Sequence, residues 1–321
     1  MKMINEDQIK SNLNVKQAIE EIRQTYIDCT NEKIYAGDRI FMPLSETDTL
    51  QILTANCKEK NYFGTKVSTV FPNNRSAGLP VTISKINLYS KETGVLESIV
   101  DANYLTAIKT GGSAAVATDL MAKKDAKVLA IIGTGLQAYS QVLAIQEVRE
   151  IEELHIFDLI SERVESFAKT IEEIQNHPYK IVTETSAQDC VKNADIICTC
   201  TASKTPVFDG NDLKAGAHVN AIGSFTSFMQ EIDTTTVLKA DKVVTEHVEG
   251  LWEAAGDILI PFNNGNITKD KVTGSLGDVL TDKVATREND EEITLYESVG
   301  SGVLDVALAI MVYEKLLEEK A

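Results

Sequence analysis

The chain has 321 residues, and its 31 Lys and Arg against 48 Asp and Glu give a formal net charge of −17. Nucleic-acid phosphates and anionic membrane surfaces attract a surplus of positive charge, so this composition predicts neither as a partner. The five cysteines form no CxxC pair and the four histidines show no ligand spacing, so no metal site is predicted. A polar, acidic start and the lack of a long apolar run predict no signal peptide and no membrane span. A cytoplasmic location is expected.

The first part of the chain predicts a helix followed by strands. Asn14 is placed to cap a helix whose apolar residues continue at helical spacing to Ile27. Between residues 40 and 100, short β-branched runs alternate with turn signals, which predicts a mainly antiparallel meander. Residues 103–122 are rich in helix formers, but Gly111 and Gly112 predict an interruption that leaves Thr110 in a glycine-rich turn.

The second part repeats a strand–helix pattern. Its predicted strands are short and apolar with little alternation, as expected of parallel strands buried on both faces; they are VLAIIG, LHIFD, KIVTET, ADIICTCT and HVNAIG. Helices are predicted from about residue 136, over 161–176, and from Ser301 to the end. This alternation predicts an α/β fold with a doubly wound parallel sheet.

The most specific motif is a glycine-rich turn between a strand and a helix, Gly133-x-Gly135-x-x-Ala138. The first glycine permits a tight turn, and the second lets a pyrophosphate approach the backbone at the helix N-terminus. Asp158 ends the next strand, where a carboxylate accepts hydrogen bonds from a ribose 2′-hydroxyl and repels a 2′-phosphate. The motif predicts a dinucleotide site for NAD, with NADH preferred over NADPH, although Arg163 lies near enough to accept the phosphate.

Five segments, in order, resemble the ornithine cyclodeaminase/μ-crystallin family: Gly64–Lys66, Ile108–Ala115, Ile132–Tyr139, Val219–Gly223 and Asp290–Gly300. The resemblance implies a Rossmann domain over 121–299. It also implies an α+β substrate-binding and dimerisation domain formed by 1–120 plus 300–321, and hence a homodimer. The residues that we expect to contact the cofactor are Thr110, Gly133, Gly135, Leu136, Gln137, Asp158, Thr201, Ala202, Gly223 and Ser298. A helix cap for Thr110 and a simple turn for Ser298 are equally compatible with the sequence.

Three cations are expected to bind the substrate. The resemblance implies that Arg39, Lys66 and Lys109 hold the carboxylate of a small α-imino or α-amino acid. An acidic protein needs such a local positive cluster to bind an acidic substrate. Lys109 stands where the family usually has Arg, so bidentate binding is not expected there. Lys66 is our candidate catalytic residue, because burial beside other cations lowers a lysine pKa enough for proton transfer.

Two positions separate the possible reactions. The family's cyclodeaminases use carboxylates that match Gln51 and Phe225 here, and neither side chain is a general acid or base. The segments DIICTCTASKTPVFDG, EIDTTTVLKA and EAAGDILIPF are similar to the branch that reduces cyclic ketimines. The resemblance therefore implies NAD(P)H-dependent reduction of a ketimine such as Δ1-pyrroline-2-carboxylate to proline. The alternatives are an ornithine cyclodeaminase, an amino-acid dehydrogenase and a non-catalytic μ-crystallin-like binding protein.

Overall fold

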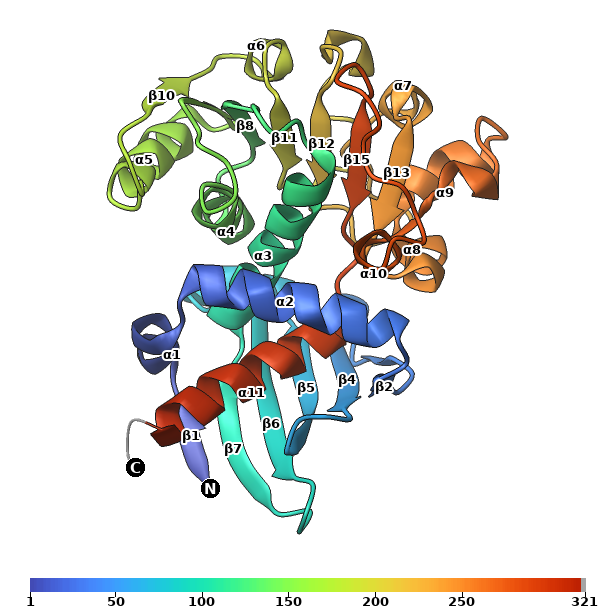
Figure 1. Cartoon of the computed structure of the whole chain (residues 1–321). Coiled ribbons are helices and arrows are strands. Elements are labelled where there is room, and N and C mark those ends of the chain that lie inside the picture. Colours follow the sequence, from blue (N-terminus) through green and yellow to red (C-terminus); the bar gives the residue numbers. More distant parts are fainter. Residues whose placement is uncertain (319–321) are drawn as a thin grey trace. The chain divides into compact units, whose positions relative to one another are not determined.

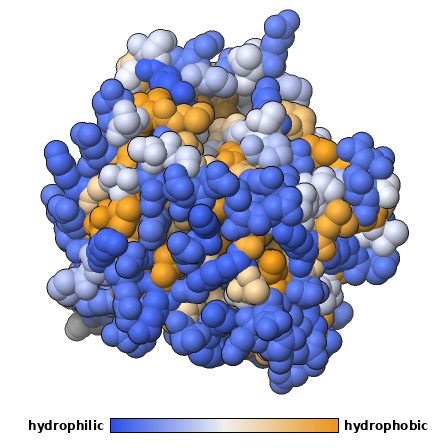
Figure 2. Space-filling view, turned by 90° about the horizontal axis from the view of Figure 1, so that it is seen from above, coloured by the Kyte–Doolittle hydropathy of each residue, from blue (hydrophilic) through white to orange (hydrophobic). Residues whose placement is uncertain are grey.

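The computed structural model describes residues 1–318 and divides the chain into two compact units. Unit 1 comprises Met1–Lys109 and the chain from Ser301 onward, and unit 2 comprises Thr110–Gly300. The first divide lies inside helix α3 (Asn103–Met121), between Lys109 and Thr110, whereas the sequence placed it at 120/121, at the end of that helix. Within the described residues, no helix is long and apolar enough to cross a membrane. Figure 2 shows one face of the molecule, on which hydrophilic residues predominate.

Unit 1 contains a seven-stranded sheet in the order β1-β7-β6-β5-β4-β2, with β3 also paired to β4. The pairings among β2 to β7 are antiparallel, which confirms the predicted meander, and β1 adds a parallel strand beside β7. The strands are β1 (Lys2–Ile4), β2 (Ile34–Ala36), β3 (Ile40–Pro43), β4 (Thr49–Cys57), β5 (Tyr62–Val70), β6 (Thr82–Ser90) and β7 (Leu96–Asp101).

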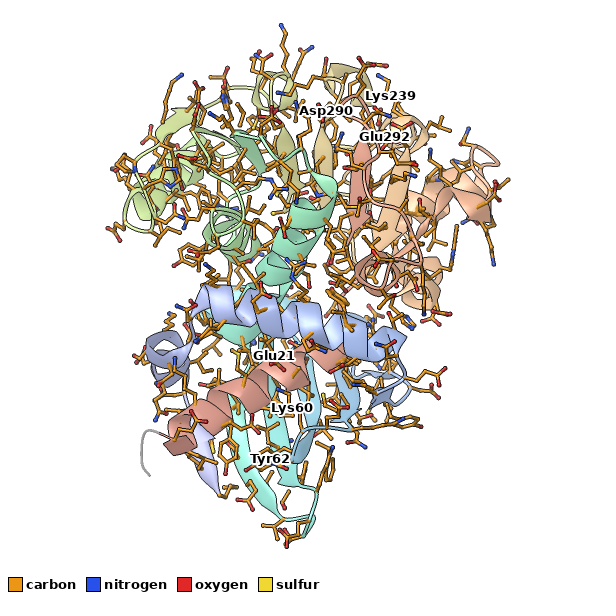
Figure 3. The ribbon with its side chains drawn as sticks, viewed as in Figure 1. Glu21, Lys60, Tyr62, Lys239, Asp290 and Glu292 are labelled. Atoms are coloured by element: carbon orange, nitrogen blue, oxygen red, sulfur yellow. The ribbon has the colours of Figure 1, made fainter. Side chains whose placement is uncertain are left out.

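Helices cover one face of this sheet (Figure 1). They are α1 (Glu6–Asn12), α2 (Val15–Thr30) and α11 (Gly302–Glu318), and a short 3₁₀ helix, η1 (Pro72–Ala77), joins β5 to β6. Asn14 caps α2 as predicted, accepting a hydrogen bond from the Gln17 backbone at 3.0 Å. Lys60, in the β4–β5 turn, pairs with Glu21 of α2 at 2.8 Å, and Tyr62 of β5 packs edge-on against Tyr313 of α11 (Figure 3).

The opposite face of the same sheet, here called the outer face, carries apolar side chains. Residues paired across antiparallel strands point to the same side, so the register places six of them together. Three are substantially exposed in the single chain: Ile40 at 51%, Met42 at 48% and Ile83 at 40%. The full set is Ile40, Met42, Leu50, Ile52, Val67 and Ile83.

Unit 2 contains an eight-stranded sheet in the order β10-β9-β8-β11-β12-β15-β13-β14. Its described pairings are all parallel, and alternate residues of β8 enter two apolar cores on opposite sides of the sheet. This confirms the predicted α/β fold with a doubly wound sheet. The strands are β8 (Val128–Ile132), β9 (Glu153–Phe157), β10 (Lys180–Thr183), β11 (Ile196–Thr199), β12 (His218–Ala221), β13 (Lys242–Thr245), β14 (Gly274–Ser275) and β15 (Thr294–Glu297).

The helices of unit 2 lie on both faces of that sheet (Figure 1). They are α4 (Leu136–Ile145), α5 (Ser161–Glu172), α6 (Ala187–Val191), α7 (Thr234–Lys239), α8 (Val248–Ala254), α9 (Gly256–Asn263) and α10 (Leu276–Leu280), with the 3₁₀ helices η2 (Gly210–Asp212) and η3 (Lys269–Lys271). The strand order reverses between β8 and β11. In open parallel sheets, ligands bind beyond the carboxyl ends of the strands at such a reversal.

Helix α3 corrects one prediction. It runs unbroken through Gly111 and Gly112, so Thr110 is a buried helical residue and the predicted glycine-rich turn is wrong. The reason is tertiary packing, because a Cβ on Gly111 would lie 2.2 Å from the carbonyl oxygen of Ser140 in α4. Only glycine permits this close approach of the two helices, and the packing outweighs its poor helix propensity.

Candidate functional site

The glycine-rich turn of unit 2 forms an open cradle at the start of α4. Gly133 follows β8 with φ +94°, and a Cβ there would lie 2.7 Å from the carbonyl oxygen of Cys200. Gly135 is the N-cap of α4, and a Cβ on it would meet nothing within 4 Å. Free space therefore lies directly in front of a helix N-terminus, which is the kind of site that binds phosphate groups.

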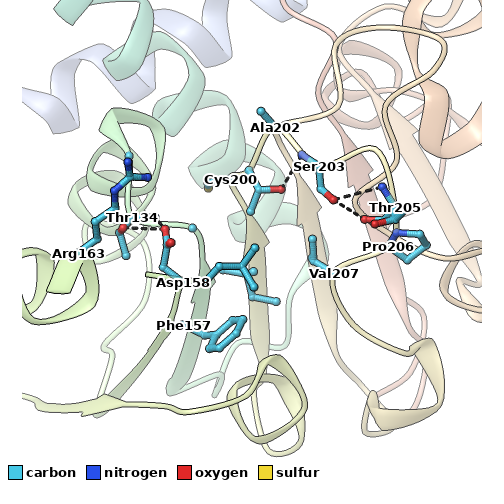
Figure 4. Close-up of a pocket in the computed structure, with 15 residues that line it drawn as sticks. Thr134, Phe157, Asp158, Arg163, Cys200, Ala202, Ser203, Thr205, Pro206 and Val207 are labelled. Atoms are coloured by element: carbon cyan, nitrogen blue, oxygen red, sulfur yellow. Dashed lines mark hydrogen bonds between the residues drawn. The ribbon is translucent and has the colours of Figure 1, made fainter. Parts of the chain in front are cut away.

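A cavity of about 540 Å³ opens at this cradle, beyond the ends of β8, β9 and β11 (Figure 4). It brings together five of the predicted cofactor residues, Gly133, Gly135, Asp158, Thr201 and Ala202. Leu136 and Gln137 follow them in the first turn of α4. The remaining lining residues are Ile132, Thr134, Phe157, Leu159, Arg163, Cys200, Ser203, Thr205, Pro206 and Val207.

Asp158 is fixed by short hydrogen bonds at the edge of this cavity. Its Oδ2 accepts from the backbone and the hydroxyl of Thr134, at 3.0 and 2.8 Å, and its Oδ1 accepts from the Ile160 backbone at 3.0 Å. A carboxylate oxygen has more than one lone pair, so each can still accept from a ligand hydroxyl. Arg163 of α5 lines the same cavity (Figure 4).

The other three predicted cofactor residues of unit 2 do not line the cavity. Thr110 is buried in α3. Gly223 follows β12, and its backbone donates to Glu231 at 2.5 Å. The hydroxyl of Ser298, just after β15, donates to Glu246 at 3.0 Å. The roles proposed for these three residues therefore stay predictions.

In unit 1, two of the three predicted cations lie beside one buried carboxylate. Lys66 of β5 contacts Asp305 of α11, with Nζ and Oδ1 2.8 Å apart, and Lys109 of α3 lies 3.9 Å from the other oxygen of Asp305. Lys66 also donates to the hydroxyl of Thr106 at 2.7 Å. We call Lys66, Thr106, Lys109 and Asp305 the lysine–aspartate cluster. Lys66, Lys109 and Asp305 are each at most 5% exposed.

The cluster holds more positive than negative charge. Burial lowers the pKa of Lys66, the Asp305 carboxylate opposes that effect, and the charges of Lys109 and Arg39 lower the pKa further. Arg39, in the exposed β2–β3 connection, is therefore close enough to act on Lys66. One carboxylate cannot balance two buried ammonium groups, and an anionic ligand would supply the missing negative charge.

Sequence reasoning missed Asp305. The only local signal is a single acid in the apolar run VLDVALAIMV, and nothing in that run indicates its partner. The two positions matched to cyclodeaminase carboxylates hold no acid. Gln51 lies in β4, and Phe225, in the loop after β12, is 62% exposed.

Comparison with known proteins identifies what the chain is similar to. It is 34% identical over 319 residues to a Delta(1)-pyrroline-2-carboxylate reductase of Bacillus cereus, a match that covers 99% of this chain and 97% of the relative. It resembles the structure of Thermococcus litoralis Delta(1)-pyrroline-2-carboxylate reductase in complex with NADH and L-proline, with a TM-score of 0.95 and 29% identity, covering 100% of this chain and 99% of that one.

An archaeal alanine dehydrogenase dimer with bound NAD is also similar, with a TM-score of 0.93 and 27% identity, covering 100% of this chain and 97% of that chain. The family profile described as "Ornithine cyclodeaminase/mu-crystallin family" matches residues 1–320. The profile and the full-length relatives agree with the resemblance carried by the five sequence segments. The chain therefore belongs to the ornithine cyclodeaminase/mu-crystallin family.

Proposed function

We propose that this chain is an NAD(P)H-dependent ketimine reductase that converts a small cyclic ketimine such as Δ1-pyrroline-2-carboxylate to L-proline. The observation that carries the proposal is the lysine–aspartate cluster, whose surplus positive charge suits a substrate carboxylate. The lack of an acid at Gln51 and Phe225 favours reduction over cyclodeamination. The similarity to two Delta(1)-pyrroline-2-carboxylate reductases supports the same reaction.

The cavity of unit 2 fits a dinucleotide cofactor. The open cradle at Gly135 and the N-terminus of α4 suit a pyrophosphate, and the Asp158 carboxylate suits ribose hydroxyls. Thr201 and Ala202 form the facing wall of the cavity. When bound, NADH supplies the hydride that the imine carbon accepts.

The residues of unit 1 bind the substrate and handle its proton. Lys66 and Lys109 attract the substrate carboxylate, and Arg39 adds charge from the exposed side of the site. Burial and neighbouring cations lower the pKa of Lys66, so its ammonium group is a stronger acid than an ordinary lysine. We assign to its Nζ the proton that the imine nitrogen takes up. Thr106 and Asp305 hold that Nζ in place.

We propose NADH rather than NADPH as the preferred reductant, because the fixed Asp158 carboxylate repels a 2′-phosphate. Asp158→Ser should raise the ratio of kcat/KM for NADPH to that for NADH by about tenfold or more. Glu162→Ser is the matched control, because it removes the same charge from the next helix without touching the cavity. An unchanged ratio in Asp158→Ser would remove the argument for NADH.

We propose that the protein is a homodimer formed through the outer face of unit 1. One face of the sheet is covered by helices of its own chain, whereas the outer face leaves Ile40, Met42 and Ile83 exposed. Contiguous exposed apolar side chains of this kind mark an interaction surface. The similar archaeal alanine dehydrogenase is a dimer.

We also propose a cytoplasmic location and a role in proline metabolism. All five cysteines are free thiols, as is usual in a reducing compartment. Proline is the product of the proposed reaction, and the similar Thermococcus litoralis structure is a complex with NADH and L-proline.

The reaction is tested by following NADH oxidation with Δ1-pyrroline-2-carboxylate, ornithine, and pyruvate with ammonia as separate substrates. We expect turnover of the ketimine, no ammonia release from ornithine, and a large loss of ketimine turnover in Lys66→Met. Proline formed from ornithine without net NADH change would instead identify a cyclodeaminase. Faster turnover of pyruvate with ammonia would identify an amino-acid dehydrogenase, and cofactor binding without any turnover would indicate a binding protein.

A further inference from the structure

Glu231 is a buried residue behind the cavity of unit 2. It does not line the cavity, but its carboxyl group accepts hydrogen bonds from Thr201, which does. It lies between β12 and α7 and is 0% exposed. Its Oε1 accepts hydrogen bonds from the backbone and the hydroxyl of Thr201, both at 2.6 Å, and its Oε2 accepts from the Gly223 backbone at 2.5 Å. Thr201 follows β11 and Gly223 follows β12. The Glu231 carboxyl group therefore links the segment that follows β11 to the segment that follows β12.

Glu231 is held through its backbone as well as through its carboxyl group. Its own backbone N–H and that of Ile232 donate to Asp257 at 2.7 and 3.0 Å, and its carbonyl accepts from the backbone of Val207, a cavity residue. A Cβ on Gly223 would lie 2.6 Å from Oε2 of Glu231 and 2.0 Å from the carbonyl oxygen of Thr201. Any shift of the carboxylate would therefore displace the cavity wall.

Hydrogen bonds, rather than a cation, hold the carboxyl group of Glu231. The described part of the chain places no lysine, arginine or histidine in an ion pair with it. Burial raises the pKa of Glu231, and the bonds from Thr201 and Gly223 oppose that rise. Glu297 nearby is also buried, but neither of its carboxylate oxygens has a hydrogen-bond partner, and burial raises its pKa well above the usual range. The two buried carboxyl groups therefore differ in their surroundings, since Glu231 accepts three hydrogen bonds and Glu297 accepts none.

We propose that Glu231 is a positioning residue that fixes the Thr201 wall and the Gly223 turn in the arrangement the dinucleotide needs before it binds. The inference rests on the proposed dinucleotide-binding function. Both tied segments lie at the carboxyl edge of a parallel sheet, where ligands of this fold bind. A wall that is ordered in advance loses less conformational freedom on binding, so affinity depends on what holds it.

Glu231→Gln tests the inference with little change of shape. A glutamine amide must place a donor toward either the Gly223 N–H or the Thr201 N–H, so at least one bond becomes a donor–donor contact. We expect the Kd of NADH, measured by fluorescence titration, and the KM of NADH to rise by about tenfold or more. At saturating NADH, kcat and the KM of the ketimine should stay within about threefold of the wild type.

Asp195→Asn is the matched structural control. Asp195 is also buried and accepts two backbone N–H bonds, from Lys127 and Val128 at 2.8 and 2.9 Å, but these lie at the start of β8, at the opposite edge of the sheet. Its other oxygen pairs with Lys214 at 2.6 Å. We expect this variant to lose thermal stability as Glu231→Gln does, while its Kd for NADH stays within about twofold of the wild type. Equal NADH affinity in the two variants would show a merely structural role and overturn the inference.

Thr201→Val keeps the test decisive if Glu231→Gln does not fold. It removes the hydroxyl, which donates to Glu231 at 2.6 Å and accepts from the Ser203 backbone at 3.2 Å, but it keeps the side-chain shape and the backbone bond to Glu231. A smaller rise in the NADH Kd, of about threefold, is therefore expected. No rise in this variant would overturn the inference. Failure of the wild type to bind NADH would overturn the proposed function and the inference with it, whereas wild-type binding with unaffected variants would overturn the inference alone.

Discussion

Asp305 is the acidic member of the lysine–aspartate cluster, the proposed substrate site of unit 1. It faces two lysines at once, with its Oδ1 2.8 Å from Lys66 and its Oδ2 3.9 Å from Lys109. Its carboxylate opposes the lowering of the Lys66 pKa by burial. Without Asp305, the two buried ammonium groups would face each other with no opposite charge between them. The loss of a proton from one lysine is the response with the lowest free-energy cost.

Asp305→Asn should therefore shift the pH dependence of catalysis. Removing the carboxylate lowers the pKa of Lys66 further, so Lys66 loses its proton at a lower pH. If the protonated form binds the carboxylate and donates the proton, kcat/KM for the ketimine falls with rising pH, and this fall moves to lower pH. Near neutral pH we expect a loss of about tenfold or more. The measurement is kcat/KM for the ketimine between about pH 6 and 10.

The control for Asp305→Asn is Asp101→Asn, which removes the same charge from a more exposed ion pair with Lys85 in the same unit. We expect the pH profile of that variant to match the wild type. A profile for Asp305→Asn that also matches the wild type would contradict the role assigned to Lys66.

The candidate site shows which residues a sequence can reveal. Gly133 and Asp158 belong to a local motif whose chemistry is read from spacing, and the structure brings them to one cavity. Lys66 and Lys109 were predicted from family segments, and the structure places them together. Asp305 lies 239 residues from Lys66 in sequence, so no local pattern indicates that contact. Their catalytic and binding roles stay predictions.

At the scale of elements, the packing of α3 against α4 explains both a correct and a wrong prediction. Apolar periodicity and turn signals identified β4 to β7 in one sheet and β8 to β12 in the other, because each pattern is local. The break at Gly111 was wrong because the contact with Ser140, which is not local, decides the conformation. Strands β2, β13, β14 and β15 were not predicted, and neither was the three-residue strand β1. Three residues become a strand only by pairing with β7, which is distant in sequence.

Gly111→Ala should destabilise unit 2. The added methyl would lie 2.2 Å from a backbone oxygen, so α3 and α4 must separate, and overpacking of this kind costs about 1–3 kcal/mol. The measurement is the unfolding midpoint in denaturant. Gly135→Ala is the control, since its methyl meets no protein atom, and we expect unchanged stability but weaker NADH binding because the methyl fills the cradle. Equal stability of the two variants would contradict the packing argument.

At the scale of the whole molecule, the outer face is the feature that a single chain leaves unexplained. Its apolar residues come from four strands, and the helices of unit 1 cover only the opposite side. The acidic surface elsewhere keeps chains apart through charge repulsion, so association through this face would be specific.

Met42→Glu should convert the proposed dimer to a monomer. A glutamate buried against a second copy would lack a partner, which costs several kcal/mol and weakens the dimer by about a hundredfold or more. Analytical ultracentrifugation measures the change in mass. Leu238→Glu is the control, because Leu238 is equally exposed, at 50% against 48%, but lies on α7 of unit 2. A dimeric Met42→Glu, or a wild type that is already monomeric, would contradict the proposal.

Unit 1 is formed by two segments that are far apart in the sequence, and their order has a consequence for biosynthesis. Its sheet is translated early, but α11 and Asp305 belong to the final segment of the chain, after all of unit 2. Domains fold as units while the ribosome proceeds from the N-terminus. Lys66 is therefore translated well before its carboxylate partner, because all of unit 2 separates the two in sequence. The proposed substrate site is thus completed only after unit 2 has been translated, whereas the cavity lies within unit 2 alone.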